Sequence, residues 1–396
     1  MSFSGSSHPA QGVAEAPPEV DGRALSLVPA PDWLPTQAGC RASTVGYTAW
    51  RSTLRESVLT AVCQFVTARR TAELDGAGFD AAGDVLMEFL AGGKCLRSTF
   101  MYLGWLCGAE PSTAAVSAAA SLELLHAFAL LQDDVMDSAT ERRGRPAMHV
   151  QLAGWHGERG LSGSARRFGE SAAILLGDLC LIWAEQMLRE SGIEPERLKV
   201  VWPHYDAMRI ELAVGQFADL AGDVRDLPAL EAVLGVARRK SGNYTVRRPL
   251  EIGAAMAGCD DRLLSQLGRY GAAVGEAFQL RDDVLGVFGS PATTGKPSGG
   301  DLREHKATSL LVTAHQMADP PTRRQLVELM SGEDLNDADL DRIRTLIVRT
   351  GAVQKVEDMI THRVESARKV LDSTMIDGAI RAALDDLAGE CGERSE

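Results

Sequence analysis

Two acidic motifs in this chain have the composition of a magnesium site. They read QDDVMD at residues 132–137 and RDDVLG at residues 281–286, and each follows a long apolar run. Carboxylates beside apolar walls are unfavourable unless positive charge lies between them. Oxygen ligands without histidine or cysteine suit a hard ion, and Mg²⁺ is typically bound by one or two carboxylates together with waters and substrate phosphates. The pair of motifs therefore predicts magnesium ions that hold a diphosphate.

The two motifs differ in the number of ligands they offer. Asp133 and Asp137 are four residues apart, so on a helix they lie on one face, whereas Asp134 points elsewhere and belongs to the outer shell. The second motif ends on Gly286 at the position where a third carboxylate would complete the pattern. One such motif alone is more often a solvated helix end, but two copies in apolar helices favour a metal site.

Positively charged residues lie near both motifs. The segment GGKCLR at 92–97 opens a helical stretch, and its two cations and free backbone N–H groups suit an anion. Taken singly, each basic residue is more simply a solvated charge or part of a turn. Together they favour the binding of diphosphate. The set comprises Lys94, Arg97, Arg142, Arg143, Lys240, Lys296 and Lys306.

An ordered series of motifs carries a family resemblance. The segments GGKCLR, ELLHAFALLQDDVMD, ERRGRPAMH, ILLGD, GQFAD, KSGNYTV, FQLRDDVLGVFG and GKPSGGDLREHK follow one another along the chain. From residue 46 to 396 the sequence resembles the trans-isoprenyl diphosphate synthases, the family of the farnesyl and geranylgeranyl diphosphate synthases. The resemblance implies a single-domain, all-α antiparallel bundle with a central cavity, and a homodimer. It also implies that the enzyme condenses isopentenyl diphosphate with an allylic diphosphate. The reaction would depend on Mg²⁺, with three ions present when substrate is bound.

The resemblance also assigns roles to individual residues. The metal set would be Asp133, Asp134, Asp137, Asp282 and Asp283, with Asp301 orienting the metal shell. The allylic diphosphate would be held, and its departure catalysed, by Arg142, Lys240 and Lys296. The diphosphate of isopentenyl diphosphate would be held by Lys94, Arg97, His126 and Arg143. The remaining substrate contacts would come from Gln216, Asp219, Ser241, Phe278, Gln279 and the lid residue Lys306.

Simpler interpretations exist for several of these residues. A histidine such as His126 on an apolar helix face is as often a satisfied core residue, and Phe278 could be ordinary core. Gln216 and Asp219 could make polar contacts between helices. The chain also departs from the family at Gln132, Ser98, Gly300 and Ser241, where His, Pro, Asp and Thr are frequent. None of these departures removes an expected direct metal ligand, so we expect a working enzyme.

Product length depends on the side chains beneath the first acidic motif. Phe128 and Ala129 stand five and four residues before Asp133, about one helical turn away. In the family, a bulky residue there forms the floor of the tunnel that receives the growing chain. One large and one small residue indicate geranylgeranyl diphosphate, with farnesyl diphosphate as the alternative.

Composition agrees with a helical enzyme. The 396 residues are 45% hydrophobic and 24% charged, and Trp50, Leu54, Val58, Val62 and Val66 recur at helical spacing. Residues 1–45 are rich in Pro, Ser, Gly and Ala and are expected to form a disordered leader. They resemble neither a signal peptide nor a transit peptide, which predicts a cytoplasmic protein.

Membrane and nucleic acid are not expected partners. The most apolar stretch, residues 172–188, is interrupted by Asp178 and Glu185, which argues against a transmembrane segment. A formal net charge of −13 argues against nucleic acid. The seven cysteines show no CxxC spacing and are expected to be reduced thiols.

The sequence leaves two other functions open. A class I terpene cyclase would ionise one diphosphate and would not need Lys94, Arg97 and Arg143 as a second anion site. A non-catalytic partner subunit could lose its metal ligands, whereas Asp133, Asp137 and Asp282 are all present here.

Overall fold

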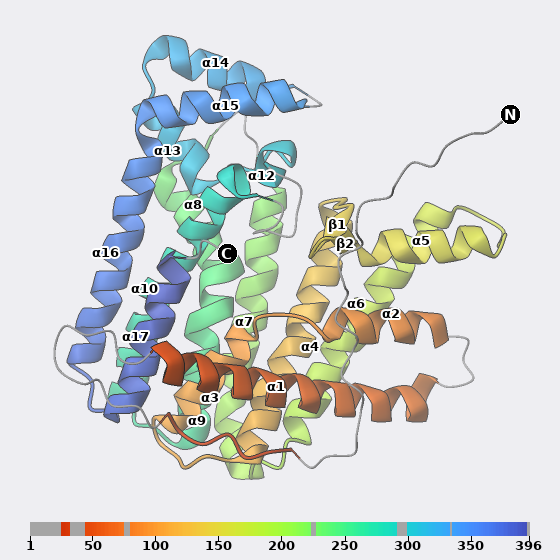
Figure 1. Cartoon of the computed structure of the whole chain (residues 1–396), viewed down its shortest axis with the longest axis vertical. Coiled ribbons are helices and arrows are strands. Elements are labelled where there is room, and N and C mark those ends of the chain that lie inside the picture. Colours follow the sequence, from red (N-terminus) through yellow and green to blue (C-terminus); the bar gives the residue numbers. More distant parts are fainter. Residues whose placement is uncertain are drawn as a thin grey trace, which may run out of the picture.

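Helices account for nearly all of the structure, as the sequence predicts. The computed structural model describes residues 25–31, 44–74, 80–222, 227–290, 299–332 and 335–393. Figure 1 shows the helices as one bundle, with a pair of short strands between the upper end of α4 and the start of α5. In chain order the first elements are α1 (Thr44–Arg69), η1 (Arg70–Leu74), α2 (Asp80–Leu90), α3 (Leu96–Leu106), α4 (Thr113–Met136), β1 (Glu141–Arg142), β2 (Arg145–Pro146), α5 (Met148–Glu158) and α6 (Ala165–Arg189). The others are α7 (Pro195–Leu220), α8 (Leu230–Ala237), η2 (Arg238–Arg247), α9 (Arg248–Ala257), α10 (Asp261–Phe288), α12 (Gly300–Arg303), α13 (Ser309–Met317), α14 (Pro320–Met330), α15 (Asp337–Thr350), α16 (Ala352–Asp372) and α17 (Gly378–Glu393).

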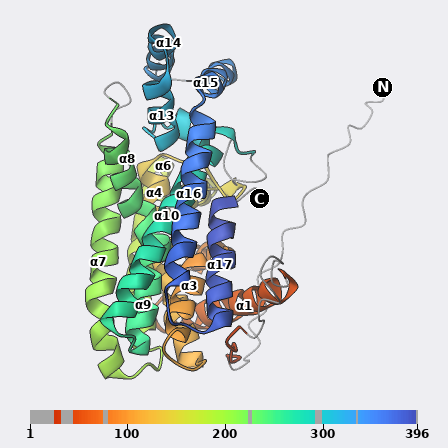
Figure 2. The same cartoon turned by 90° about the vertical axis from the view of Figure 1, so that its left-hand side faces the viewer.

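Three pairs of closely packed helices build the core. Helix α4 packs along α6, α3 along α9, and α10 along α16 (Figure 2). Helices α3 and α9 approach so closely because both lack a side chain at the contact. A Cβ at Gly253 would clash with the carbonyl of Met101, and one at Gly104 would clash with the carbonyl of Leu250. The residues on these helices are therefore fixed by packing on nearly all sides.

The predicted apolar stripe of the first helix is confirmed. Trp50, Leu54, Val58, Val62 and Val66 all lie on α1 and are all buried. Because these side chains repeat every three to four residues, they lie on one face of the helix. That face packs against the bundle, and the opposite face is left for polar groups.

Residues 25–31 of the expected leader lie against the bundle. Val28 is fully buried. Its carbonyl accepts a hydrogen bond from the hydroxyl of Tyr102, and Trp50 Nε1 donates to the carbonyl of Pro29 at 2.9 Å. The other residues of the leader before Thr44 lie outside the described residues.

Helices α4 and α6 are each long and apolar enough to cross a membrane when judged by length and composition alone. Within the apolar windows of these two helices, 61% and 44% of the residues are buried inside the protein. The core helices of a soluble protein pass the same test, so this is weak support for a membrane span.

Candidate active site

The first acidic motif ends α4 and is surrounded by cations from other elements. Asp133 Oδ1 lies 3.3 Å from Lys240 Nζ and accepts a hydrogen bond from Gln216 Nε2 at 3.2 Å. Its Oδ2 lies 3.2 Å from an Nη of Arg142. Helix α7, η2 and strand β1 thus each place one predicted site residue around this carboxylate of α4.

Asp137 caps the end of α4 and pairs with Lys306, whose Nζ lies 2.6 Å from Oδ2. Burial, followed by the charge of Asp133, raises the pKa of Asp137. Burial disfavours the charged ammonium of Lys306, but Glu304 and Asp137 outweigh it and raise the lysine pKa. This lysine is therefore a permanent cation beside the acidic motif, 169 residues from Asp137 along the chain.

Lys240 is the second permanent cation at the motif. Its Nζ lies 2.6 Å from Oδ2 of Asp219 on α7, and burial is offset by Asp133 and Asp219, so its pKa is raised. The lysine stands on the π-helical segment η2, which packs directly against α10. This contact depends on Gly242 and Gly275, since a Cβ on Gly275 would fall against the carbonyl group of Gly242.

Two of the predicted metal residues are turned into the protein. Asp134 is fully buried and bonded to Arg142. Asp283 accepts hydrogen bonds from Gln279 Nε2 and from the backbone N–H of Ser309, both at 2.8 Å, and burial raises its pKa. Their carboxylates orient neighbouring groups, which suits a supporting role around a metal better than direct ligation.

The second acidic motif gains a carboxylate from outside its own helix. Asp282 lies on α10 and is partly buried, and Gly286 follows one turn later. The carboxylate of Asp301, from α12, fills the space that a Cβ at Gly286 would need. The second acidic motif itself therefore lacks a third carboxylate, as expected from the sequence. Asp301 places a carboxylate beside the motif from another helix. Lys296 lies outside the described residues.

A second basic site lies nearer the middle of α4. Arg97, in the first turn of α3, donates from an Nη to Thr245 Oγ1 at 3.0 Å, and its guanidinium lies 4.4 Å from the ring centre of Tyr244. Burial and the nearby Arg97 lower the pKa of His126, so its imidazole is neutral. Arg97 Nε and His126 Nδ1 are both buried with no hydrogen-bond partner among the described residues. A buried polar atom of this kind needs a partner, such as an ordered water or a bound ligand.

Arg143 connects this basic site to the turn between β1 and β2. The residue has a positive φ of 56°, which sends its side chain back over the segment before α3. A Cβ at Gly92 or at Gly93 would lie 3.3 Å from its guanidinium, and it donates to the carbonyl of Phe89 at 3.1 Å. Burial lowers the pKa of Arg143. Lys94 is exposed on the same segment.

The predicted apolar and chain-length residues lie on the helices that carry the aspartates. Phe128 and Ala129 are partly buried on α4, and Phe278 is buried on α10. Ser241 follows Lys240 on η2 and is partly buried. The central chamber that these residues would line stays a prediction.

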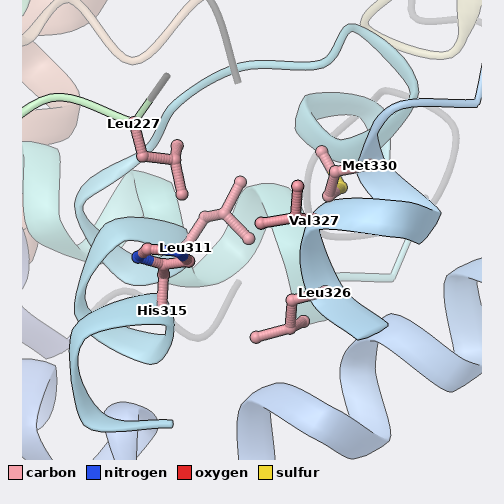
Figure 3. Close-up of a pocket in the computed structure, with 6 residues that line it drawn as sticks. All are labelled: Leu227, Leu311, His315, Leu326, Val327 and Met330. Atoms are coloured by element: carbon pink, nitrogen blue, oxygen red, sulfur yellow. The ribbon is translucent and has the colours of Figure 1, made fainter. Parts of the chain in front are cut away.

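The apolar pocket drawn in Figure 3 lies elsewhere, between α13, α14 and Leu227. The rest of its lining is formed by Leu311, His315, Leu326, Val327 and Met330.

The donor set at the acidic motifs suits Mg²⁺ together with a phosphate ligand. Within the described ranges, no three Asp, Glu, His or Cys side chains converge closely enough to hold a metal ion by themselves. Mg²⁺ needs only one or two carboxylates when waters and phosphate oxygens complete its octahedron. Asp133 and Asp137 meet that requirement, and their lysine and arginine partners are cations that a diphosphate can also use.

Comparison with known proteins gives the family. The family model for polyprenyl synthetase matches residues 81–347. This chain belongs to the polyprenyl synthetase family. It is 34% identical to geranylfarnesyl diphosphate synthase of Aeropyrum pernix over 73% of this chain and 86% of the relative. It is 29% identical to nonaprenyl diphosphate synthase of Mycobacterium tuberculosis, over 72% of this chain and 79% of the relative. A crystal structure of geranylgeranyl pyrophosphate synthase from Corynebacterium glutamicum, complexed with isoprenyl diphosphate and magnesium, superposes with a TM-score of 0.82 at 37% identity, covering 87% of this chain and 99% of that one.

The chain is thus a prenyl diphosphate synthase, and the all-α fold is that of its relatives. The relatives are named for products of different length, so the family does not give the product of this synthase.

Sequence reasoning missed several residues that shape this synthase's site. Glu123 is a buried carboxylate one turn before His126, and it accepts a hydrogen bond from Ser98 Oγ at 2.6 Å. Ser98, at a position where proline is frequent in the family, is the signal for this pair that the sequence contains. Arg51 and Arg55 of α1 donate to carbonyls of the segment before α3. They lie about 40 residues before that segment and belong to no motif, so nothing in the sequence pointed to them.

Proposed function

We propose that this synthase condenses isopentenyl diphosphate with an allylic diphosphate, head to tail and all-trans, and that its main product is geranylgeranyl diphosphate. One observation carries the proposal: α4 bears two sites suited to anions. Asp133 and Asp137 stand at its end among lysines, and His126, beside Arg97, stands two turns earlier. A reaction that joins two diphosphate substrates needs both sites.

The residues divide between the two substrates. Asp133, Asp137 and Asp282 would hold Mg²⁺, and Arg142, Lys240, Lys296 and Lys306 would hold the allylic diphosphate. Lys94, Arg97, His126 and Arg143 would hold isopentenyl diphosphate. When bound, Mg²⁺ supplies Lewis-acid stabilisation to the departing diphosphate. Asp134 and Asp283 would keep Arg142 and the end of α10 in place, because each is tied to protein donors.

The proposed chemistry needs positive charge around the departing diphosphate and water-free apolar walls around the reacting carbon atoms. The C1–O bond of the allylic substrate breaks, and its electron pair leaves with the diphosphate. Lys240 and Arg142 lower this barrier because they are already positioned as cations. The isopentenyl double bond attacks the allylic carbon, and a proton is then lost to the released diphosphate. Phe128 and Phe278 offer apolar walls without a nucleophile.

The test is a direct assay. Purified protein is incubated with isopentenyl diphosphate, Mg²⁺ and dimethylallyl, geranyl or farnesyl diphosphate in turn, and the dephosphorylated alcohols are separated by chromatography. We expect geranylgeraniol with each starter and no product when EDTA removes the metal. Asp133→Ala and Asp282→Ala should lower the rate at least a hundredfold with the fold intact by circular dichroism. Undiminished rates in both variants would refute the proposal.

The same assay separates the alternatives. A class I terpene cyclase would make cyclic hydrocarbon from a single diphosphate. A partner subunit would make nothing with any starter. The buried, unpartnered Arg97 Nε and His126 Nδ1 favour the condensing synthase, because a cyclase has no second diphosphate to place there.

Phe128 is proposed as the floor of the product tunnel. Its side chain is partly buried five residues before Asp133. Phe128→Ala should open space below the growing chain and shift the product beyond twenty carbons, whereas Ala129→Phe should shorten it to fifteen. Product length is read from the alcohols in the same assay. If Phe128→Ala leaves the length unchanged, Phe128 is not the floor.

We infer that two copies of the chain form a homodimer in the cytoplasm. Helices α6 and α7 expose large apolar side chains, and the ion pair between Arg209 and Glu185 joins the two helices. Exposed apolar side chains gathered on neighbouring helices are typical of a protein interface.

A further inference from the structure

The segment between α2 and α3 has a backbone that must be held in place. Gly93 has a φ of +124°, a region that other residues rarely adopt, and Cys95, the residue before α3, has a φ of 49°. Left-handed backbone at a non-glycine residue is strained and persists only where surrounding contacts fix it. Lys94 lies between these two residues, so its position depends on those contacts.

Two arginines of α1 supply the contacts. Arg55 Nε donates to the carbonyl of Gly93 at 2.7 Å, and an Nη of Arg51 donates to the carbonyl of Lys94 at 3.1 Å. In a trans peptide the C=O and the next N–H point in opposite directions. Because both carbonyls are turned towards α1, the N–H groups of Lys94 and Cys95 are turned away from it. The arginines therefore set the orientation of two peptide planes beside the predicted diphosphate site.

Helix α17 secures one of the arginines. The other Nη of Arg51 forms an ion pair with Glu390 Oε2, and the same oxygen accepts a hydrogen bond from the hydroxyl of Tyr47 at 3.1 Å. The first turns of α1 lie beside α17 in both Figure 1 and Figure 2. Glu390 also places a negative charge next to a region that already holds Arg51 and Arg55. The last helix of the chain is thus connected to Lys94 through a single guanidinium group.

We propose that Arg51, Arg55 and Glu390 are positioning residues for the second diphosphate site. They hold the segment 91–95 so that Lys94 and its neighbouring N–H groups face isopentenyl diphosphate. They act through the backbone of the segment, since their contacts end on carbonyl oxygens and not at the predicted substrate position. The inference rests on the proposed function and adds a dependence of isopentenyl diphosphate binding on the C-terminal helix.

The experiment compares two ion pairs of the same helix. Glu390→Ala removes the partner of Arg51, and Asp385→Ala is the control, because Asp385 on α17 pairs with Arg368 of α16 at 2.6 Å, whereas Glu390 pairs with Arg51 of α1. We expect Glu390→Ala to raise the KM for isopentenyl diphosphate about threefold to tenfold, the effect of one net hydrogen bond. The KM for the allylic substrate and the kcat should stay within about twofold. Asp385→Ala should leave both KM values unchanged.

Two further variants separate positioning from charge and from stability. Arg51→Lys keeps the charge but cannot contact Glu390 and the Lys94 carbonyl together, so it should weaken isopentenyl diphosphate binding as much as Glu390→Ala does. The double variant Arg51→Lys/Glu390→Ala should be no worse than either single one, because one connection is broken in all three. Melting temperatures are measured for every variant, since a loss of stability alone would affect both substrates.

A binding measurement makes the result independent of turnover. Isopentenyl diphosphate is titrated calorimetrically into each protein in EDTA, where the metal-dependent site is silent. Weaker binding for Glu390→Ala than for Asp385→Ala supports the proposal. Equal binding in the two variants overturns it. An equal rise in the KM for isopentenyl diphosphate and the KM for the allylic substrate in Glu390→Ala also overturns it. An inactive parent protein that still binds isopentenyl diphosphate would instead refute the proposed function and leave the calorimetric comparison valid.

Discussion

At the residue scale, the second acidic motif makes a sharp prediction about Asp301 and Gly286. The Asp301 carboxylate occupies the space that a side chain at 286 would need, so Gly286→Asp crowds two carboxylates and Asp301→Gly removes one. Each single change should lower kcat about tenfold to a hundredfold, the usual effect of removing a group that orients metal ligands. The double change Gly286→Asp/Asp301→Gly restores one carboxylate and should recover most of the activity.

The control for this exchange is Gly300→Asp, beside Asp301. A Cβ at Gly300 has nothing within 4 Å, so an added carboxylate there meets open space and should leave kcat within about twofold. Binding of Mn²⁺, followed by electron paramagnetic resonance, gives a second measurement, in which the double variant should bind more tightly than Asp301→Gly. A double variant as impaired as both single variants would show that the two positions do not substitute for each other.

Residue types and spacing singled out charged residues that the structure brings close together, but they did not show which residue pairs with which. Asp133, Asp137, Lys240 and Lys306 could be named because a motif fixes a residue type at a position. That Lys306 would pair with Asp137, or that Asp301 would lie against Gly286, depends on how separate helices are packed. The sequence encodes that packing through many weak contacts, so spacing along the chain does not reveal it.

At the element scale, the contact between η2 and α10 is sensitive to substitution. Gly242 and Gly275 allow the two backbones to touch, and a Cβ at 275 would overlap the Gly242 carbonyl. Gly275→Ala should therefore push η2 away from α10, lower stability by about 1 to 3 kcal/mol and displace Lys240 from Asp133. Urea unfolding measures the first effect, and the KM for the allylic substrate should rise as evidence of the second.

Gly154→Ala on α5 is the matched control for that change. A Cβ at Gly154 meets nothing within 4 Å, so alanine should be neutral or stabilise the helix by about 0.5 to 1 kcal/mol. If Gly275→Ala is as stable as Gly154→Ala, the two backbones are not held in contact as described.

Long helices were predictable, and the irregular segments were not. The stripe on α1 and the apolar run of α4 show a repeat that a single sequence displays clearly. The π-helical η2 and the packing of residues 25–31 show no such repeat. Their conformations follow from glycine contacts and from single hydrogen bonds to distant residues, which local pattern does not encode.

At the scale of the whole molecule, the exposed faces of α6 and α7 predict the oligomeric state. Ile210, Val214 and Phe217 are spaced by four and three residues on α7, so they form one apolar stripe, and Phe217 is 75% exposed. Leu175 and Ile182, two turns apart on α6, are also exposed. Water in contact with so much apolar surface is unfavourable, and a second copy of the same face would cover it.

Phe217→Arg should therefore convert the proposed homodimer to a monomer, because it places a charge in the middle of the stripe that the second copy would cover. Sedimentation velocity at micromolar protein measures this directly. Val348→Arg is the control: Val348 is 57% exposed on α15, away from α6 and α7, so the same new charge there should leave the dimer intact. The adjacent Gln216 contacts Asp133, so a dimer interface over α7 would also lie against the active site. If Phe217→Arg is monomeric, it should therefore also lose activity. If Phe217→Arg is still a dimer, this face is not the interface.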